Sequence, residues 1–197
     1  MAISDKLQQA FSLFDKANEQ DPHTEITPSG KTYPKELLYA LRMTEKLNNF
    51  APKASEALQL TARCQHICRW EIPRESYEMN RTGYLKWRQD LKKFHAQKAS
   101  AILEEVGYDQ ETIEKVAFLL EKKQLKKNED TQTLEDVICL VFLEHYFEPF
   151  ASQHDEAKVI DILQKTWRKM SEEGHEAALK LPLSKNSLEL VSKAIAG

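Results

Sequence analysis

The sequence predicts an all-α fold in a single domain that covers residues 1–197. Only five glycines interrupt the chain. Alternation of β-branched residues is almost absent, and apolar residues recur three and four positions apart, which is the spacing of one helix face. The hydrophobic fraction is 41%, with eight Phe and three Trp, which is enough to form a core. A chain of this length suits one compact domain.

The first half of the chain contains the patterns of four helices. The first helix has the apolar row Leu7, Phe11 and Phe14, and the segment "DPHTEITPSGKTYP" then ends it with three prolines and a glycine. A loop, "WEIPRESYEMNRTG", separates the third helix from the fourth. The expected ranges are 4–19, 35–49, 52–69 and 84–106.

The second half begins with Gly107 as a helix C-cap and Asp109 as the N-cap of a fifth helix. The segment 121–130, "EKKQLKKNED", is typical of a solvated charge run. A sixth helix, 134–147, contains "VICLVFL", which is apolar on all sides and is therefore expected to form the buried centre of the fold. Two further helices are expected at 156–172 and 186–196.

Composition excludes several classes of protein. The net charge of −3 gives no reason to expect bulk attraction to nucleic acid or to a membrane. Cys64, Cys68 and Cys139 are an odd number of cysteines and do not predict a disulfide framework. Cys64 and Cys68 also lack the second ligand pair that a zinc site needs. The sequence has no signal-peptide pattern and no apolar run near the roughly 18 residues of a membrane span, so a soluble cytoplasmic protein is expected.

Two histidines are candidates for chemistry. His95 shares one stripe of the fourth helix with Trp87, Leu91 and Ala99, so its side chain is expected to point inward. His66 borders the apolar face of the third helix. Two interpretations of His95 stay open, either a buried neutral imidazole bonded to the backbone, or a metal ligand or general base.

Two carboxylates flank the apolar run of the sixth helix, Asp136 before it and Glu144 after it. Charges in these positions are costly unless they are exposed, paired or bound to a cation. They therefore lie in solvent or pair with arginine, or they join the two histidines in a site for one divalent metal ion.

The stretch from Arg63 to Lys98 is basic. It holds nine Lys and Arg and four acidic residues, a local charge of +5, and its arginines alternate with tryptophans and tyrosines. Guanidinium groups suit phosphate and aromatic faces suit bases or sugars, although a basic solvated surface explains the same pattern. The candidate anion-binding residues are Arg63, Arg69, Arg74, Arg81 and Arg88.

Five segments resemble a family of uncharacterised soluble proteins of bacteria, fungi and plants that is known as a domain of unknown function. They are "KELLYALRMTEKL", "ARCQHICRWEIPRESY", "GYLKWRQDLKKFHAQKA", "TLEDVICLVFLEHYF" and "IDILQKTWRKMS". Some members of that family carry a glutamyl-tRNA synthetase label. The sequence lacks a pair of synthetase nucleotide-binding motifs in a strand-and-helix context, and "RKMS" falls on an expected helix.

The order of the segments also resembles the HD superfamily of helical metal-dependent phosphohydrolases. "YALRM" matches the first histidine element with Tyr39 in the histidine position, and "TARCQHI" matches the His-Asp pair but has Gln65 and His66 there. "FHAQKASAILEEVG" matches the later histidine helix with His95, and "LVFLE" matches the last element with Glu144 in the aspartate position. This resemblance implies an HD-like bundle around the helix that contains "VICLVFL".

The resemblance further implies a metal-dependent hydrolase of a nucleotide or other small phosphate ester. The implied metal ligands are His66, His95 and Glu144, and the implied catalytic side chains are Gln65 and Asp136. A bound metal would lower the pKa of a water molecule while the arginines hold the phosphate. The alternative is a non-catalytic module that binds a nucleotide or RNA, or a protein adaptor that uses loop 70–83. The sequence does not predict the oligomeric state.

One geometric prediction tests the site. Consecutive helices usually pack together, and His66 and His95 come from the third and fourth helices. We therefore expect the two imidazoles within about 8 Å of each other, a separation that allows a shared ligand but exceeds the metal–histidine bond length of about 2.0–2.1 Å. At least one of the candidate arginines should reach the same cluster.

Overall fold

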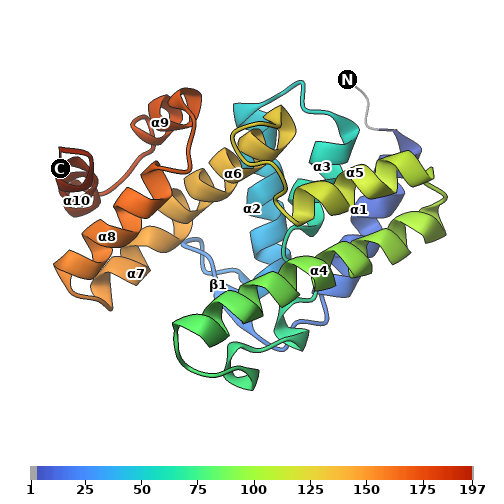
Figure 1. Cartoon of the computed structure of the whole chain (residues 1–197), viewed down its shortest axis with the longest axis horizontal. Helices are drawn as coiled ribbons and strands as arrows, with labels where there is room; N and C mark the ends of the chain where they lie inside the picture. Colours follow the sequence, from blue (N-terminus) through green and yellow to red (C-terminus); the bar gives the residue numbers. More distant parts are fainter. Residues whose placement is uncertain (1–3, 197) are drawn as a thin grey trace.

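The computed structural model describes residues 4–196 (Figure 1). This part of the chain forms ten α-helices and one antiparallel hairpin of two three-residue strands, Thr24–Ile26 (β1) and Thr32–Pro34 (β2), so the all-α class is confirmed. The helices are α1 Asp5–Asn18, α2 Lys35–Phe50, α3 Glu56–Cys64, α4 Arg81–Val106, α5 Gln110–Leu120, α6 Glu129–Val141, α7 Phe147–Ser152, α8 Glu156–Trp167, α9 Glu172–Ala178 and α10 Lys185–Ala196.

The ends of the helices follow from short polar side chains. Asp109 caps α5 by accepting a hydrogen bond from the backbone N–H of Thr112, and Gly107 ends α4 with a φ of +84°, as predicted from the sequence. Ser4 and Ser55 cap α1 and α3 in the same way as Asp109 caps α5. The cap at Ser55 also explains why α3 begins at Glu56 and not at residue 52 as expected.

Helix α3 is shorter than predicted and ends at Cys64 instead of near residue 69. The chain turns sharply here because Cys68 has a left-handed φ of +53°, and its backbone N–H donates to the side-chain oxygen of Asn18 in α1. His66 consequently lies in a turn and not on a helix face.

Three other segments differ from the expected helices. The proline-rich segment after α1 forms the β1–β2 hairpin. The sixth helix begins at Glu129 and passes through a π-helical turn, Phe142–Tyr146, before α7 begins. The expected helix 156–172 stops at Trp167, and α9 follows as a separate helix. None of the described helices combines the length and apolarity that a membrane span needs.

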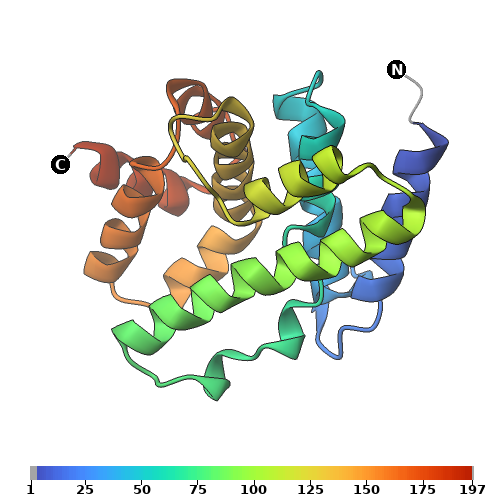
Figure 2. The ribbon, with the colours of Figure 1, turned by 45° about the vertical axis from the view of Figure 1, so that its right-hand side comes forward.

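Helix α6 lies in the middle of the fold, where it packs against α2, α3, α5 and α9 (Figure 1). Five of the seven residues from 137 to 143 are buried, and Ile138 and Phe142 are half-buried. On one side, α4 lies along α5 and crosses near α1 (Figure 2). On the other side, α8 and α10 pack together with α7 around their own apolar cluster. The polar residues described below lie between α2, the turn after α3, and α4.

Candidate functional site

The two predicted histidines lie side by side. The ring centroids of His66 and His95 are 5.9 Å apart, which is within the predicted 8 Å. His95 lies in α4, and its imidazole ring is held in place by a 2.8 Å hydrogen bond between Nδ1 and the carbonyl oxygen of Ile67. Because Ile67 follows His66 directly, this bond also fixes the turn that carries His66.

The protonation of His95 follows from its partner. A carbonyl oxygen only accepts hydrogen bonds, so Nδ1 carries the hydrogen and Nε2 carries a lone pair. The side chain is almost fully buried, with a relative exposure of 4%, and Nε2 has no hydrogen-bond partner among residues 4–196. Burial, assisted by His66, lowers the pKa of His95 to about 3. The ring is therefore neutral at neutral pH and presents an unused acceptor.

His66 is also neutral and has partners at both nitrogens. Arg69 donates from Nη1 to Nε2 of His66 at 3.0 Å, which leaves the hydrogen on Nδ1. Nδ1 lies 3.3 Å from Oε2 of Glu36, and the ring stacks on Tyr39 with centroids 4.1 Å apart. Burial, followed by the charge of Arg69, lowers the pKa of His66 well below its usual value.

Glu36 is a site residue that the sequence reasoning missed. Its carboxylate contacts His66, and its Oε1 lies 4.0 Å from Nε of Arg69. Burial raises the pKa of Glu36 from 4.5 to about 7, although Arg69 acts in the opposite direction. A signal was present in the sequence, because Glu36 shares the buried stripe of α2 with Tyr39 and Met43, and a carboxylate on a core stripe is uncommon.

Tyrosine and arginine residues close the cluster on the α2 side. Tyr39 lies 6.0 Å from Tyr146, centroid to centroid. Arg42 donates to the hydroxyl of Tyr146 at 2.8 Å and to Glu25 of the β1–β2 hairpin at 2.5 Å. The hairpin is thereby attached to α2, the helix that carries Glu36.

A group of cations continues from the histidines toward solvent. Arg88, Lys92 and His95 are spaced four and three residues apart and so occupy one face of α4. Lys122 lies in the loop after α5 and pairs with Glu135 of α6 at 2.8 Å. Helix α4, which carries Lys92, packs along α5, and Lys122 follows α5 by two residues. Burial, followed by the charge of Lys122 and then that of Arg88, lowers the pKa of Lys92.

Of the five predicted anion-binding arginines, Arg69 contacts the histidine cluster. Arg63 forms a two-pronged bond with Asp15 of α1, at 2.7 and 2.5 Å. Arg74 donates to three backbone carbonyls of its own loop. Arg81 is exposed at the start of α4, and Arg88 donates to the hydroxyl of Tyr84 at 3.1 Å. Arg63 and Arg74 thus have structural bonds, Arg69 contacts the cluster, and Arg88 stands exposed on the face of α4 that bears His95.

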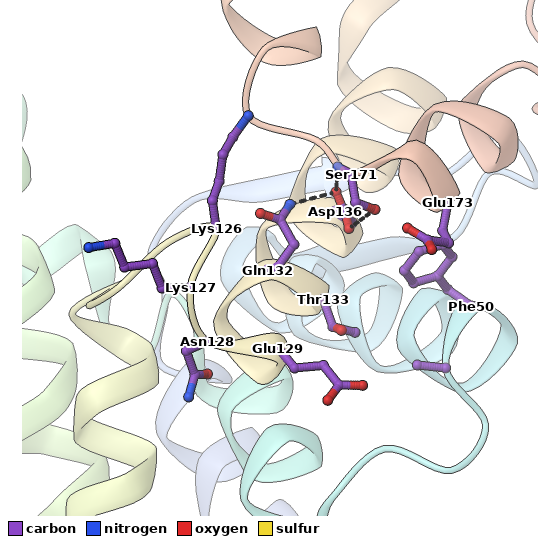
Figure 3. A pocket seen from close by; sticks show the side chains of 11 residues that line it. Phe50, Lys126, Lys127, Asn128, Glu129, Gln132, Thr133, Asp136, Ser171 and Glu173 are labelled. Atoms are coloured by element: carbon purple, nitrogen blue, oxygen red, sulfur yellow. Dashed lines mark hydrogen bonds between the residues drawn. The ribbon is translucent and has the colours of Figure 1, made fainter.

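Asp136 serves the architecture. Its carboxylate accepts hydrogen bonds from the backbone N–H and the hydroxyl of Ser171, at 2.8 and 2.7 Å, and from Gln132 at 3.1 Å (Figure 3). Ser171 in turn caps α9. The side chain lines an open hollow of about 530 Å³ between α6 and α9, and none of the residues lining that hollow belongs to the histidine cluster.

The remaining predicted residues lie apart from each other. Glu144 pairs with Lys46 at 2.5 Å and lies 3.4 Å from His145. Gln65 directly follows α3, and its Oε1 is buried without a partner in the described range. Across residues 4–196, no three His, Cys, Asp or Glu side chains gather closely enough to hold a metal ion. Of the implied ligand set, His66 and His95 are neighbours, and Glu144 pairs with Lys46.

The fold and the cluster define an all-α protein with a partly buried, cation-rich polar site. The chain belongs to the family described as Domain of unknown function (DUF4202), whose model matches residues 8–191. A search of curated proteins and a search of solved structures each found no match. The resemblance to the HD superfamily stays a prediction.

Proposed function

We propose that this protein binds a small phosphorylated molecule at the cluster of His66, His95 and Arg69. The observation that carries the proposal is the crowding of positive charge in a partly buried place. Burial lowers the pKa of Arg69 even though Glu36 acts to raise it. Buried cations without sufficient counter-charge are unfavourable, and an anionic ligand would supply that counter-charge.

The chemistry of the cluster suits a phosphate monoester. Arg69 bonds His66 through Nη1, and its remaining N–H groups could donate to phosphate oxygens in the usual fork geometry. The lone pair on Nε2 of His95 could accept a hydrogen bond from a protonated phosphate oxygen or a ligand hydroxyl. Tyr39 and His66 form a flat stacked surface beside these groups.

The test measures binding of orthophosphate and adenosine monophosphate by calorimetry at low salt. Arg69→Gln should weaken binding by about tenfold or more, because a hydrogen bond to a charged group contributes about 1.5–3 kcal/mol. Arg81→Gln is the matched control, because Arg81 is exposed at the start of α4, and it should change the affinity by less than about twofold. Absence of binding to the wild type, or equal effects of the two changes, would overturn the proposal.

Hydrolysis of the bound ester is a second candidate function, favoured by the contact between Glu36 and His66. A carboxyl with a pKa of about 7 is near half protonation at neutral pH, which is the condition for efficient general acid–base catalysis. Phosphate release from p-nitrophenyl phosphate would test it, and Glu36→Gln should abolish release while leaving phosphate affinity intact.

The metal-dependent form of this reaction is tested separately. Bound manganese, nickel, iron and zinc would be measured in the purified protein, with His95→Ala as the control. Metal that is present in the wild type and lost from His95→Ala would support the metal-dependent form. Metal retained by His95→Ala, or absent from both proteins, would count against it.

A further inference from the structure

The charge run after α5 is only partly solvated, which corrects the expectation from its composition. Lys122 is turned inward, with a side-chain exposure of 13%, and its Nζ lies 2.8 Å from Oε2 of the buried Glu135. Lys169, from the segment between α8 and α9, approaches the other carboxylate oxygen of Glu135 at 3.6 Å. Two cations from distant segments of the chain therefore share one carboxylate.

The loop that carries Lys122 has an unfavourable backbone. Lys122, Gln124 and Lys126 have φ values of 55°, 56° and 68°, which is the left-handed region that residues other than glycine rarely adopt. Conformations of this kind cost about 1–3 kcal/mol each and persist where the surrounding structure enforces them. The ion pair of Lys122 with Glu135 provides such an anchor, and it holds the ammonium group against α6.

This second set of cations is continuous with the histidine cluster. Arg88 and Lys92 stand on the face of α4 that also bears His95. The charges of Lys122 and Arg88 both contribute to the lowered pKa of His66, after burial and Arg69. The charge of Glu135 likewise acts on Tyr39. Because α4 packs along α5 and Lys122 follows the last residue of α5 by two positions, the two sets are neighbours and form one site, with an inner part at the histidines and an outer part at the lysines.

The charges in this site do not balance. The cations are Arg69, Arg88, Lys92, Lys122 and Lys169, and the carboxylates among them are Glu36 and Glu135, so the excess is three positive charges when both acids are ionised. A phosphate monoester carries about −1.5 to −2 at neutral pH and would leave part of the excess uncompensated. Two linked phosphate groups would come close to matching it.

We infer that the ligand carries two phosphate groups, of which the first lies at Arg69 and the histidines and the second between Lys92 and Lys122. This inference rests on the proposed function and specifies its ligand class. Arg88 lies one helical turn from Lys92 on the same face of α4 and would contact the second group. When the second phosphate binds, Lys122 shares its charge between that phosphate and Glu135, with Lys169 still beside the carboxylate.

The experiment compares pyrophosphate with orthophosphate, because the two probes differ only in the number of phosphate groups. In calorimetry at fixed low salt, the wild type should bind pyrophosphate about tenfold or more tightly than orthophosphate. Lys122→Gln should reduce that ratio to about threefold or less, since it removes a charge-assisted contact. Lys123→Gln is the matched control, because Lys123 is exposed and pairs with Glu121, and it should leave the ratio unchanged.

Lys122→Gln leaves Glu135 with less counter-charge and could impair folding. Lys92→Gln therefore provides a second variant that keeps the pair of Lys122 and Glu135, and it should also lower the ratio. Equal affinities for the two probes in the wild type, or an unchanged ratio in Lys92→Gln, would overturn the inference and leave the proposed function standing. Absence of binding for both probes would instead overturn the proposed function.

Discussion

Asp136 of α6 and Glu36 of α2 are buried carboxylates on helices that pack against each other, yet their surroundings differ. Asp136 accepts three hydrogen bonds, two from Ser171 and one from Gln132. Glu36 has His66 at 3.3 Å and Arg69 at 4.0 Å. Both oxygens of Asp136 have close hydrogen-bond donors, whereas burial destabilises the charged form of Glu36 and raises its pKa. The second arrangement is typical of a functional site.

Removal of the Asp136 carboxylate should have the largest effect on stability. Asp136→Ala leaves the N–H and hydroxyl of Ser171 without their acceptor and weakens the start of α9, and it should lower the free energy of unfolding by about 4 kcal/mol. Asp136→Asn keeps one acceptor oxygen and should lose about half as much. Urea denaturation would measure both, and a loss under about 1 kcal/mol for Asp136→Ala would show that Asp136 does not anchor α9.

The opposite result is expected for Glu36→Gln, which should be more stable than the wild type above neutral pH. The pKa of Glu36 is raised from 4.5 to about 7 in the folded protein, so the folded state binds more protons than the unfolded state between these values. The protonation of this group therefore contributes about 3 kcal/mol to the free energy of unfolding below pH 4.5. That contribution is lost as the pH rises through about 7.

The measurement for Glu36 is the difference in unfolding free energy between Glu36→Gln and the wild type from pH 4.5 to 8. His66 and His95 have lowered pKa values, so their contribution is present above pH 6.5 and is lost as the pH falls, but it is nearly the same in both proteins. A difference that does not grow with pH would show that Glu36 stays ionised in the folded protein.

The substitution Gly174→Ala should have the smallest of the three effects on stability, and it tests how tightly Asp136 is enclosed. A Cβ atom on Gly174 would lie 2.6 Å from Oδ1 of Asp136, so Gly174→Ala should lower the free energy of unfolding by about 2 kcal/mol through overpacking. In the Asp136→Ala background the same change should cost little, because the clashing atom is gone. A double-mutant cycle measures this coupling, and strictly additive effects would contradict the close contact.

Periodicity and capping were sufficient to predict most helices, since α1, α4 and α5 combine local apolar rows with local caps and α2 has a local apolar row. His95 was also predictable, because its position on the stripe of α4 determines that it points inward. The location of His66 depended on the left-handed turn at Cys68 and on Asn18 in a distant helix. Such a contact between distant segments leaves no periodic pattern in the sequence.

The outer part of the site could not be predicted from the sequence for a different reason. Lys122 stands in a run of charged residues whose composition indicates solvent, and its inward direction depends on an unfavourable backbone and on Glu135 from the next helix. Glu36 could have been found, because it shares a stripe with buried residues of α2. Asp136 and Glu144 were correctly identified as charges that need partners, but their partners are Ser171 and Lys46.

The π-helical turn Phe142–Tyr146 between α6 and α7 has a consequence for the whole C-terminal part of the chain. A turn of this kind holds one more residue than a turn of α-helix, and each residue of an α-helix advances the chain by about 100° around its axis. Tyr146 reaches Arg42 from this turn. A relative that lacks one residue between Val141 and Phe147 would present α7 to α8 with a different face and would move this tyrosine away from α2. Chain length in this short interval therefore determines both the orientation of the last helices and one wall of the site.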